Sequence, residues 1–226
     1  MNGTPIMEIN RDTFWTLIDQ AREHPDGHSE WLMEQLIRLG PEQAKNFDDI
    51  TSAYMALADQ YGLWTAASVM DCGSCTDDGF IDFRGWLIAQ GREVYMAALK
   101  DPDSLADVQV YPDYHVDVFQ YIGAVAYEKL TGREVSENVD VGRYHALKAE
   151  LKKDIVYGEG IGYPYTWSET EAYLPRLCAM YIGPEELAWL IKYHNDTWNL
   201  TSPDIQSART NAQKSKRIKN DRGDAR

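Results

Sequence analysis

The sequence predicts an all-α protein, built as a multi-helix globular domain with a small C-terminal helical extension and a disordered basic tail. Two observations favour helices. Apolar residues recur at three- and four-residue steps along most of the chain, and glycine or proline stands where those runs stop. Because 44% of the 226 residues are apolar, the chain is long and hydrophobic enough for a core of ordinary size.

The first four helices follow from apolar stripes in the first seventy residues. Asp12 is the expected cap of the first stripe, and Gly40 ends the second. Pro41 opens a third helix, expected to run to Gly62, because proline suits the first turn of a helix. A short fourth helix, 64–70, leads into a segment rich in Cys, Asp and Gly, which we expect to be a loop.

Further stripes predict helices on both sides of Gly91, the second of which ends at Asp101-Pro102. A longer helix is expected over 114–131, with Gly132 as its C-terminal cap.

The C-terminal part of the chain is less regular. Ser168 and Glu171 match a capping box for a helix that reaches about Tyr181, and Pro184 opens another helix. We expect residues 1–135 to form the main domain, 136–201 an extension with a Gly/Tyr-rich loop, and 202–226 a disordered tail.

Charge is distributed unevenly along the chain. Residues 202–226 hold seven basic and three acidic residues, so the rest of the chain carries a net charge of −18 against −14 for the whole protein. An acidic body attracts basic partners and repels nucleic acid, so we expect nucleic-acid binding, if any, only through the tail. With three cysteines and no membrane-spanning apolar run, the sequence predicts a cytoplasmic protein without membrane contact.

A set of motifs resembles the bacterial domain-of-unknown-function family 4240. The motifs are Phe14-Trp15, the helix with Trp64, the run Cys75-Thr-Asp-Asp-Gly-Phe-Ile-Asp-Phe-Arg-Gly-Trp-Leu-Ile88, Gln90-Gly91 and Asp101-Pro-Asp-Ser-Leu105. The resemblance covers roughly residues 14–130. It implies a helical domain without an assigned activity, and it transfers no catalytic residue, cofactor or substrate. The family pattern has one cysteine, at Cys75, so Cys72 departs from it.

The pair Cys72 and Cys75 has three interpretations. Two thiolates supply half of a tetrahedral zinc site, but no second Cys-x-x-Cys or His-x-x-x-His completes it. A thioredoxin-like redox role requires a βαβ context that the pattern lacks. We favour thiols that simply pack, and we expect neither a metal nor a cofactor.

The adjacent carboxylates Asp77 and Asp78 have two possible roles, one structural and one in binding. They precede a predicted helix beginning near Phe80, where a carboxylate caps free N–H groups, and Arg84 lies close enough to pair with a neighbouring aspartate. Alternatively, these three side chains stand at the rim of a pocket lined by Trp64, Phe83 and Trp86, where they bind a polar ligand, a cation or a partner.

The loop around Tyr157, Tyr163, Tyr165 and Trp167 is a second candidate for partner contacts, because aromatic side chains are common at interfaces. The alternative is a loop folded onto the body.

Two functions remain open at this point. The first is an acidic protein-binding module that regulates or neutralises a partner protein, as an immunity or regulatory protein does. The second is a small metal-assisted hydrolase or transferase that uses Asp77 and Asp78. The sequence contains no complete catalytic motif, so it does not decide whether the protein is an enzyme.

Overall fold

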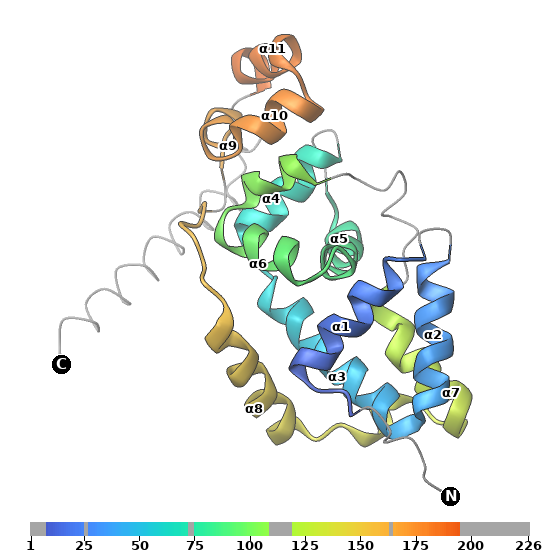
Figure 1. Cartoon of the computed structure of the whole chain (residues 1–226). Coiled ribbons are helices and arrows are strands. Elements are labelled where there is room, and N and C mark those ends of the chain that lie inside the picture. The colour runs from blue at the N-terminus through green and yellow to red at the C-terminus, as the bar shows by residue number, and fades with distance from the viewer. Residues whose placement is uncertain (1–7, 25–26, 72–74, 109–118, 163–164, 195–226) are drawn as a thin grey trace, which may run out of the picture.

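The computed structural model of the chain describes residues 8–24, 27–71, 75–108, 119–162 and 165–194. Within these ranges the secondary structure is helical and includes no strand, which confirms the all-α prediction (Figure 1). The predicted tail, 202–226, lies outside the described residues. None of the described helices is long and apolar enough to cross a membrane.

Helix α3 lies at the centre of the first group of helices. It contacts the first two helices, α5 (Asp77–Ala89), α7 and α8, so its buried face is shared among several neighbours (Figure 1). The helices of this group are α1 (Arg11–Ala21), α2 (His28–Leu39), α3 (Pro41–Leu57), α7 (Ile122–Thr131) and α8 (Val141–Leu151). Pro41 begins α3 directly after Gly40, whose positive φ of 91° permits the sharp turn from α2.

Aromatic rings from three helices meet at the core. Trp15 of α1 packs against Tyr54 of α3 with ring centroids 4.8 Å apart, and Tyr95 of α6 (Arg92–Lys100) lies 5.2 Å from the same ring. Trp15 Nε1 donates to the Tyr54 hydroxyl at 3.0 Å, and the Tyr95 hydroxyl donates to the Tyr54 carbonyl at 2.7 Å. The buried polar atoms of this cluster are therefore satisfied, as a stable core requires.

A second group of helices packs at the other end of α3. It consists of α4 (Tyr61–Met70), α5 (Asp77–Ala89), α6 (Arg92–Lys100) and the 3₁₀ helix η1 (Pro102–Asp107). The chain then continues through η3 (Phe119–Tyr121), α7 and η4 (Val135–Asn138) to α8.

Predicted boundaries in the N-terminal half are wrong at the start of α1 and between α3 and α4. Asn10, not Asp12, caps α1, because its side chain accepts from the backbone N–H groups of Asp12 and Thr13. The third helix ends at Leu57, before Gly62. Gly62 lies inside α4, where a Cβ would stand 2.3 Å from the Tyr173 hydroxyl, so the glycine provides close packing and not a break.

The long helix predicted over 114–131 begins in the structure as the short η3 and continues as α7, while residues 114–118 lie outside the described residues. Helix α8 was not predicted.

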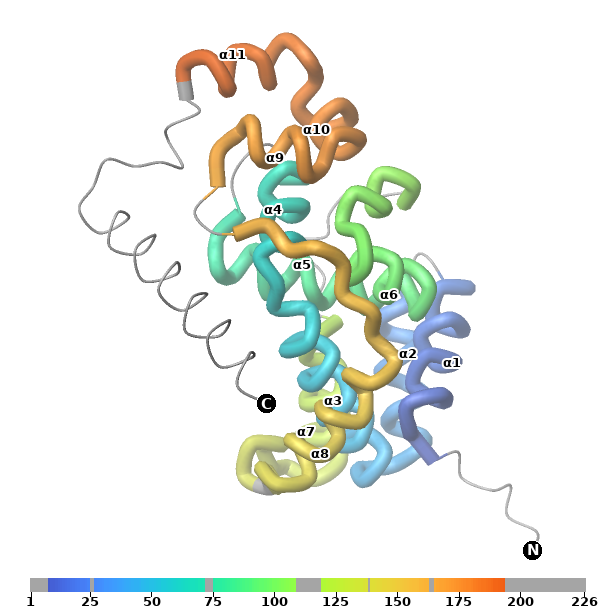
Figure 2. The backbone as a smooth tube through the Cα atoms, turned by 90° about the vertical axis from the view of Figure 1, so that its left-hand side faces the viewer, coloured from blue at the N-terminus to red at the C-terminus, as the bar shows by residue number. Residues whose placement is uncertain are grey.

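After α8 the chain continues through η5 (Lys152–Asp154) and a non-helical linking segment, residues 155–162. Figure 2 shows this segment running along the outside of the body toward the opposite end. There α9 (Trp167–Tyr173), α10 (Pro175–Tyr181) and α11 (Pro184–His194) contact one another, and α10 packs on α4 and η1.

The single helix predicted from Ser168 to Tyr181 is therefore two helices, divided at Leu174-Pro175. The capping box is formed by Thr166 and Glu169, two residues earlier than predicted.

Candidate functional site

The turn before α5 holds the aspartates that the sequence singled out. Thr76 caps α5, because its hydroxyl oxygen accepts from the Gly79 N–H at 3.1 Å. Asp77 and Asp78 are the first two residues of the helix, and both are exposed. The capping role predicted for one of them is thus taken by Thr76, while their charges still complement the positive end of the helix dipole.

Arg84 does not pair with the neighbouring aspartates, contrary to the prediction. Its guanidinium lies 3.8 Å from Asp59, donates to the Met55 carbonyl at 3.0 Å and stands 4.7 Å from the centre of the Phe80 ring. Burial lowers the pKa of this arginine. Arg84 therefore links α5 to the C-terminal end of α3.

The aromatic side chains expected to line a pocket there belong to the core. Phe83 and Trp86 are buried, and Trp64 is half-buried. Trp64 stacks on Phe80 with centroids 4.9 Å apart, and its Nε1 donates to the Cys75 carbonyl at 3.1 Å. Of the predicted set, only Asp77 and Asp78 are exposed, so binding at this turn stays a prediction that concerns these two carboxylates.

The Cys75 thiol is held in its protonated form. Burial raises its pKa to about 11, and the charges of Asp71, Asp77 and Asp82 act in the same direction. Zinc binding and nucleophilic attack both require the thiolate, so these surroundings favour a packing role. Among the described residues, no group of three or more His, Cys, Asp or Glu side chains is placed to hold a metal ion. Cys72 lies outside the described residues.

The Gly/Tyr-rich loop is folded onto the body where the structure describes it. The Tyr157 hydroxyl donates to the Leu57 carbonyl at 3.1 Å, while Tyr165 and Trp167 are buried. Tyr163 lies outside the described residues. Partner contacts of Tyr157 and Tyr165 stay a prediction. Tyr165 would have to leave its buried position to make them, whereas Tyr157 is half-buried.

An exposed aromatic pair on α11 was missed by the sequence analysis. Trp189 is 50% exposed and Tyr193 is 60% exposed, and their ring centroids are 5.9 Å apart. Glu185 precedes Trp189 by four residues and is also exposed. The signal was present as the four-residue spacing of Glu185, Trp189 and Tyr193, on the face of α11 opposite the buried Leu187. We call these three residues the α11 stripe.

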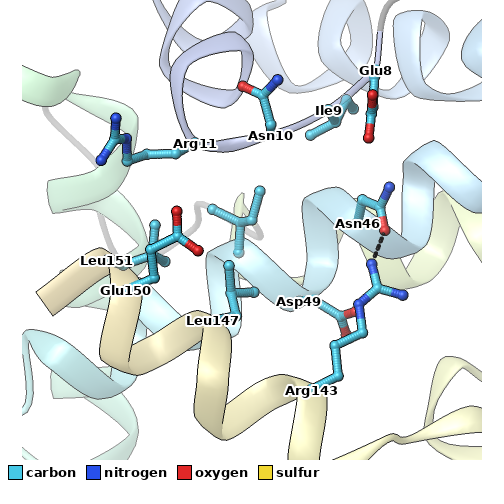
Figure 3. Close-up of a pocket in the computed structure, with 11 residues that line it drawn as sticks. Glu8, Ile9, Asn10, Arg11, Asn46, Asp49, Arg143, Leu147, Glu150 and Leu151 are labelled. Carbon is cyan, nitrogen blue, oxygen red and sulfur yellow. Dashed lines mark hydrogen bonds between the residues drawn. The ribbon is translucent and has the colours of Figure 1, made fainter.

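A groove opens between the N-terminal segment 8–11, α3 and α8 (Figure 3). Its volume is about 190 Å³. Ile9, Ile50 and Leu151 are buried and form its apolar floor with Leu147. The remaining lining residues are polar or charged: Glu8, Asn10, Arg11, Asn46, Asp49, Arg143 and Glu150. Because α8 was not predicted, no residue of this groove was a predicted site residue.

Residues 9–129 match the model of one protein family, whose description is protein of unknown function (DUF4240). The match runs from the segment before α1 into the last turn of α7, in close agreement with the resemblance found in the sequence. No curated protein and no solved structure matches the chain.

Proposed function

The chain belongs to the DUF4240 family, a family without an assigned activity, and we propose that it is a cytoplasmic, acidic protein-binding module that regulates or neutralises a basic partner protein. One observation carries the proposal: in the α11 stripe two large aromatic side chains, Trp189 and Tyr193, keep 50% and 60% of their surface exposed, one turn after the exposed Glu185.

The exposed parts of these two rings leave apolar surface in contact with water, which a bound partner would cover. Trp and Tyr are enriched among the residues that dominate binding energy at protein interfaces. Trp189 and Tyr193 stand on a helix of the extension, far along the chain from the aromatic core of the main domain. A partner that covers them removes apolar surface from water and gains about 25 cal/mol for each Å² buried.

The negative charge of the protein favours a basic partner. The body before residue 202 carries −18, and Glu185 lies one helical turn before Trp189. An arginine or lysine of a partner can contact the exposed part of the Trp189 ring while pairing with Glu185, an arrangement that combines cation–π and ionic attraction. Lys192 already lies 4.8 Å from the centre of the Tyr193 ring, so this ring accepts a cation within the chain itself.

The test uses two fluorescent peptides of equal length and apolar content, one carrying four arginines and the other four glutamates. Fluorescence anisotropy with the full chain is expected to show binding of the arginine peptide only. Trp189→Ala is expected to weaken it by a factor of about 30, as loss of an interface hot spot of about 2 kcal/mol does.

Tyr121→Ala is the matched control, because Tyr121 is 51% exposed and belongs to η3 in the main domain. Equal binding of the two peptides, or equal losses for Trp189→Ala and Tyr121→Ala, would contradict the proposal.

A further inference from the structure

We propose that the groove between residues 8–11, α3 and α8 accepts a single lysine or arginine side chain of a partner protein. The inference rests on the proposed function only in taking the partner to be basic. The site itself is separate from the α11 stripe and is built from other elements.

The size and floor of the groove fit one long side chain. Sites for cofactors and drug-sized ligands have volumes of about 300–1,000 Å³, which is more than the 190 Å³ available here. The floor of Ile9, Ile50 and Leu151 is buried and apolar. Lysine and arginine carry aliphatic stems that cover such a surface while the charged end stays in contact with water.

The walls of the groove are held in place before any ligand arrives. The Ile9 N–H donates to Gln43 Oε1 at 2.6 Å, which fixes the N-terminal segment to α3. On the opposite wall, Arg143 Nη2 donates to Asn46 Oδ1 at 2.6 Å and fixes α8 to α3 (Figure 3). A site whose walls are already ordered loses little entropy on binding.

Both arginines of the groove are already engaged. Arg11 lies 2.8 Å from Asp154 and 3.2 Å from Asp12. Arg143 makes the bond to Asn46 described above. An anionic ligand would therefore compete with interactions that these two side chains make within the chain.

The carboxylates of Glu8 and Glu150, by contrast, make no side-chain hydrogen bond or ion pair with any residue that the structure describes. Figure 3 shows them on opposite walls, Glu8 on the N-terminal segment and Glu150 on α8. Asp49, the third carboxylate, is held by Lys45 at 2.9 Å. Arg143 bonds only the neutral amide of Asn46, so its positive charge remains and offsets part of this negative charge. With three carboxylates against two arginines the lining is still negative overall. The complementary group above an apolar floor is a side chain with an aliphatic stem and a cationic end.

The experiment is an NMR titration of the isotope-labelled full chain with acetyl-Gly-Arg-Gly-amide. Its neutral counterpart carries citrulline, which has nearly the same shape as arginine and no charge. We expect saturable shifts for the backbone amides and methyl groups of Ile50, Leu147 and Leu151 with the arginine peptide, and at least about fivefold weaker binding of the citrulline peptide.

The double variant Glu8→Gln and Glu150→Gln keeps the shape of the groove and removes its two free charges. It is expected to lower affinity for the arginine peptide at least about fivefold. The matched control, Glu128→Gln with Glu137→Gln, changes the net charge equally at exposed positions outside the groove and should bind as the parent does.

Absence of saturable shifts, shifts confined to other regions, or equal binding by both double variants would overturn the inference. The result is independent of the proposed function, because Trp189→Ala leaves the groove intact. Loss of binding in the glutamate variant alone implicates the groove, whereas loss in Trp189→Ala alone implicates the α11 stripe.

Discussion

At the level of single residues, Asp48 is the clearest case of a charge held under strain by packing. It lies where α3 crosses α7, so close that a Cβ on Gly123 would stand 2.8 Å from the Asp48 nitrogen. Burial raises the pKa of its carboxyl from 3.8 to about 6, and the charge of Asp49 adds to the effect, while Lys45 and a hydrogen bond from the Ala124 backbone oppose it. The carboxylate is therefore less favourable in the native protein than in the unfolded chain.

Asp48→Asn is expected to stabilise the protein at neutral pH. Because the native pKa of Asp48 lies above the unfolded value, its contribution to stability is complete below pH 3.8 and is lost as pH rises through about 6. The variant should gain about 1–2 kcal/mol at pH 7 and little at pH 4. Urea unfolding at several pH values measures the difference, with Glu42→Gln, an exposed acid of the same helix, as the control. A gain that does not depend on pH would contradict this account.

At the level of elements, the contact between η1 and α10 explains how the extension is attached. Pro175 begins α10, and Leu174 before it has no side chain able to cap the helix. The Asp103 carboxylate of η1 supplies the cap instead, accepting from the Arg176 N–H at 3.1 Å and from the Leu177 N–H at 3.0 Å. One aspartate of the Asp-Pro-Asp-Ser-Leu motif thus serves a helix more than seventy residues later in the chain.

Asp103→Ala is expected to destabilise α10 by about 1–3 kcal/mol, because two backbone donors lose a charged acceptor. Hydrogen exchange at the Arg176 and Leu177 amides should quicken accordingly. Asp107→Ala is the comparison: Asp107 pairs with the Arg176 side chain, but the two are 69% and 52% exposed, so water screens the pair and its loss should change stability far less than the loss of Asp103. Equal effects of the two variants would show that the cap is unimportant.

At the level of the whole molecule, the linking segment 155–162 holds the two ends of the fold together. Its Gly158 N–H donates to the Leu99 carbonyl at 3.3 Å, and the Tyr173 hydroxyl of α9 donates to the Glu159 carbonyl at 3.0 Å. At Gly158 the backbone passes so close to α6 that a side chain does not fit: a Cβ would stand 1.8 Å from the Lys100 carbonyl oxygen.

Gly158→Ala should therefore displace the segment and destabilise the protein by about 2 kcal/mol or more, the scale of overpacking in a closely packed site. Gly160→Ala is a demanding control, since it lies two residues away and a Cβ there has nothing within 4 Å. Thermal unfolding of both variants, followed by circular dichroism, tests the claim. An equal loss of stability in Gly160→Ala would show that the close approach to Lys100 is not the cause, because a Gly→Ala change without a steric clash is expected to stabilise slightly by restricting the unfolded chain.

Sequence patterns alone predicted the fold class, the resemblance to the family and the start of helices such as α3 and α11, because apolar spacing and first-turn prolines act locally. They failed at Gly62 and Leu174, where the outcome depends on residues far away in the chain. Helix α8 was missed for the same reason: it buries Leu151 but little else, and its place is set by contacts with α3.

What the sequence determined by itself is an acidic helical protein in which a segment rich in Cys, Asp and Gly precedes a helix with an apolar face. Only the tertiary structure decided which charges are free: it turns Arg84 toward Asp59, engages Arg11 and Arg143, and leaves Glu8 and Glu150 on the walls of a groove. The physical reason is that charge partners are chosen by distance in space, and segments such as 8–11 and 141–151 meet only after α3 has brought them together.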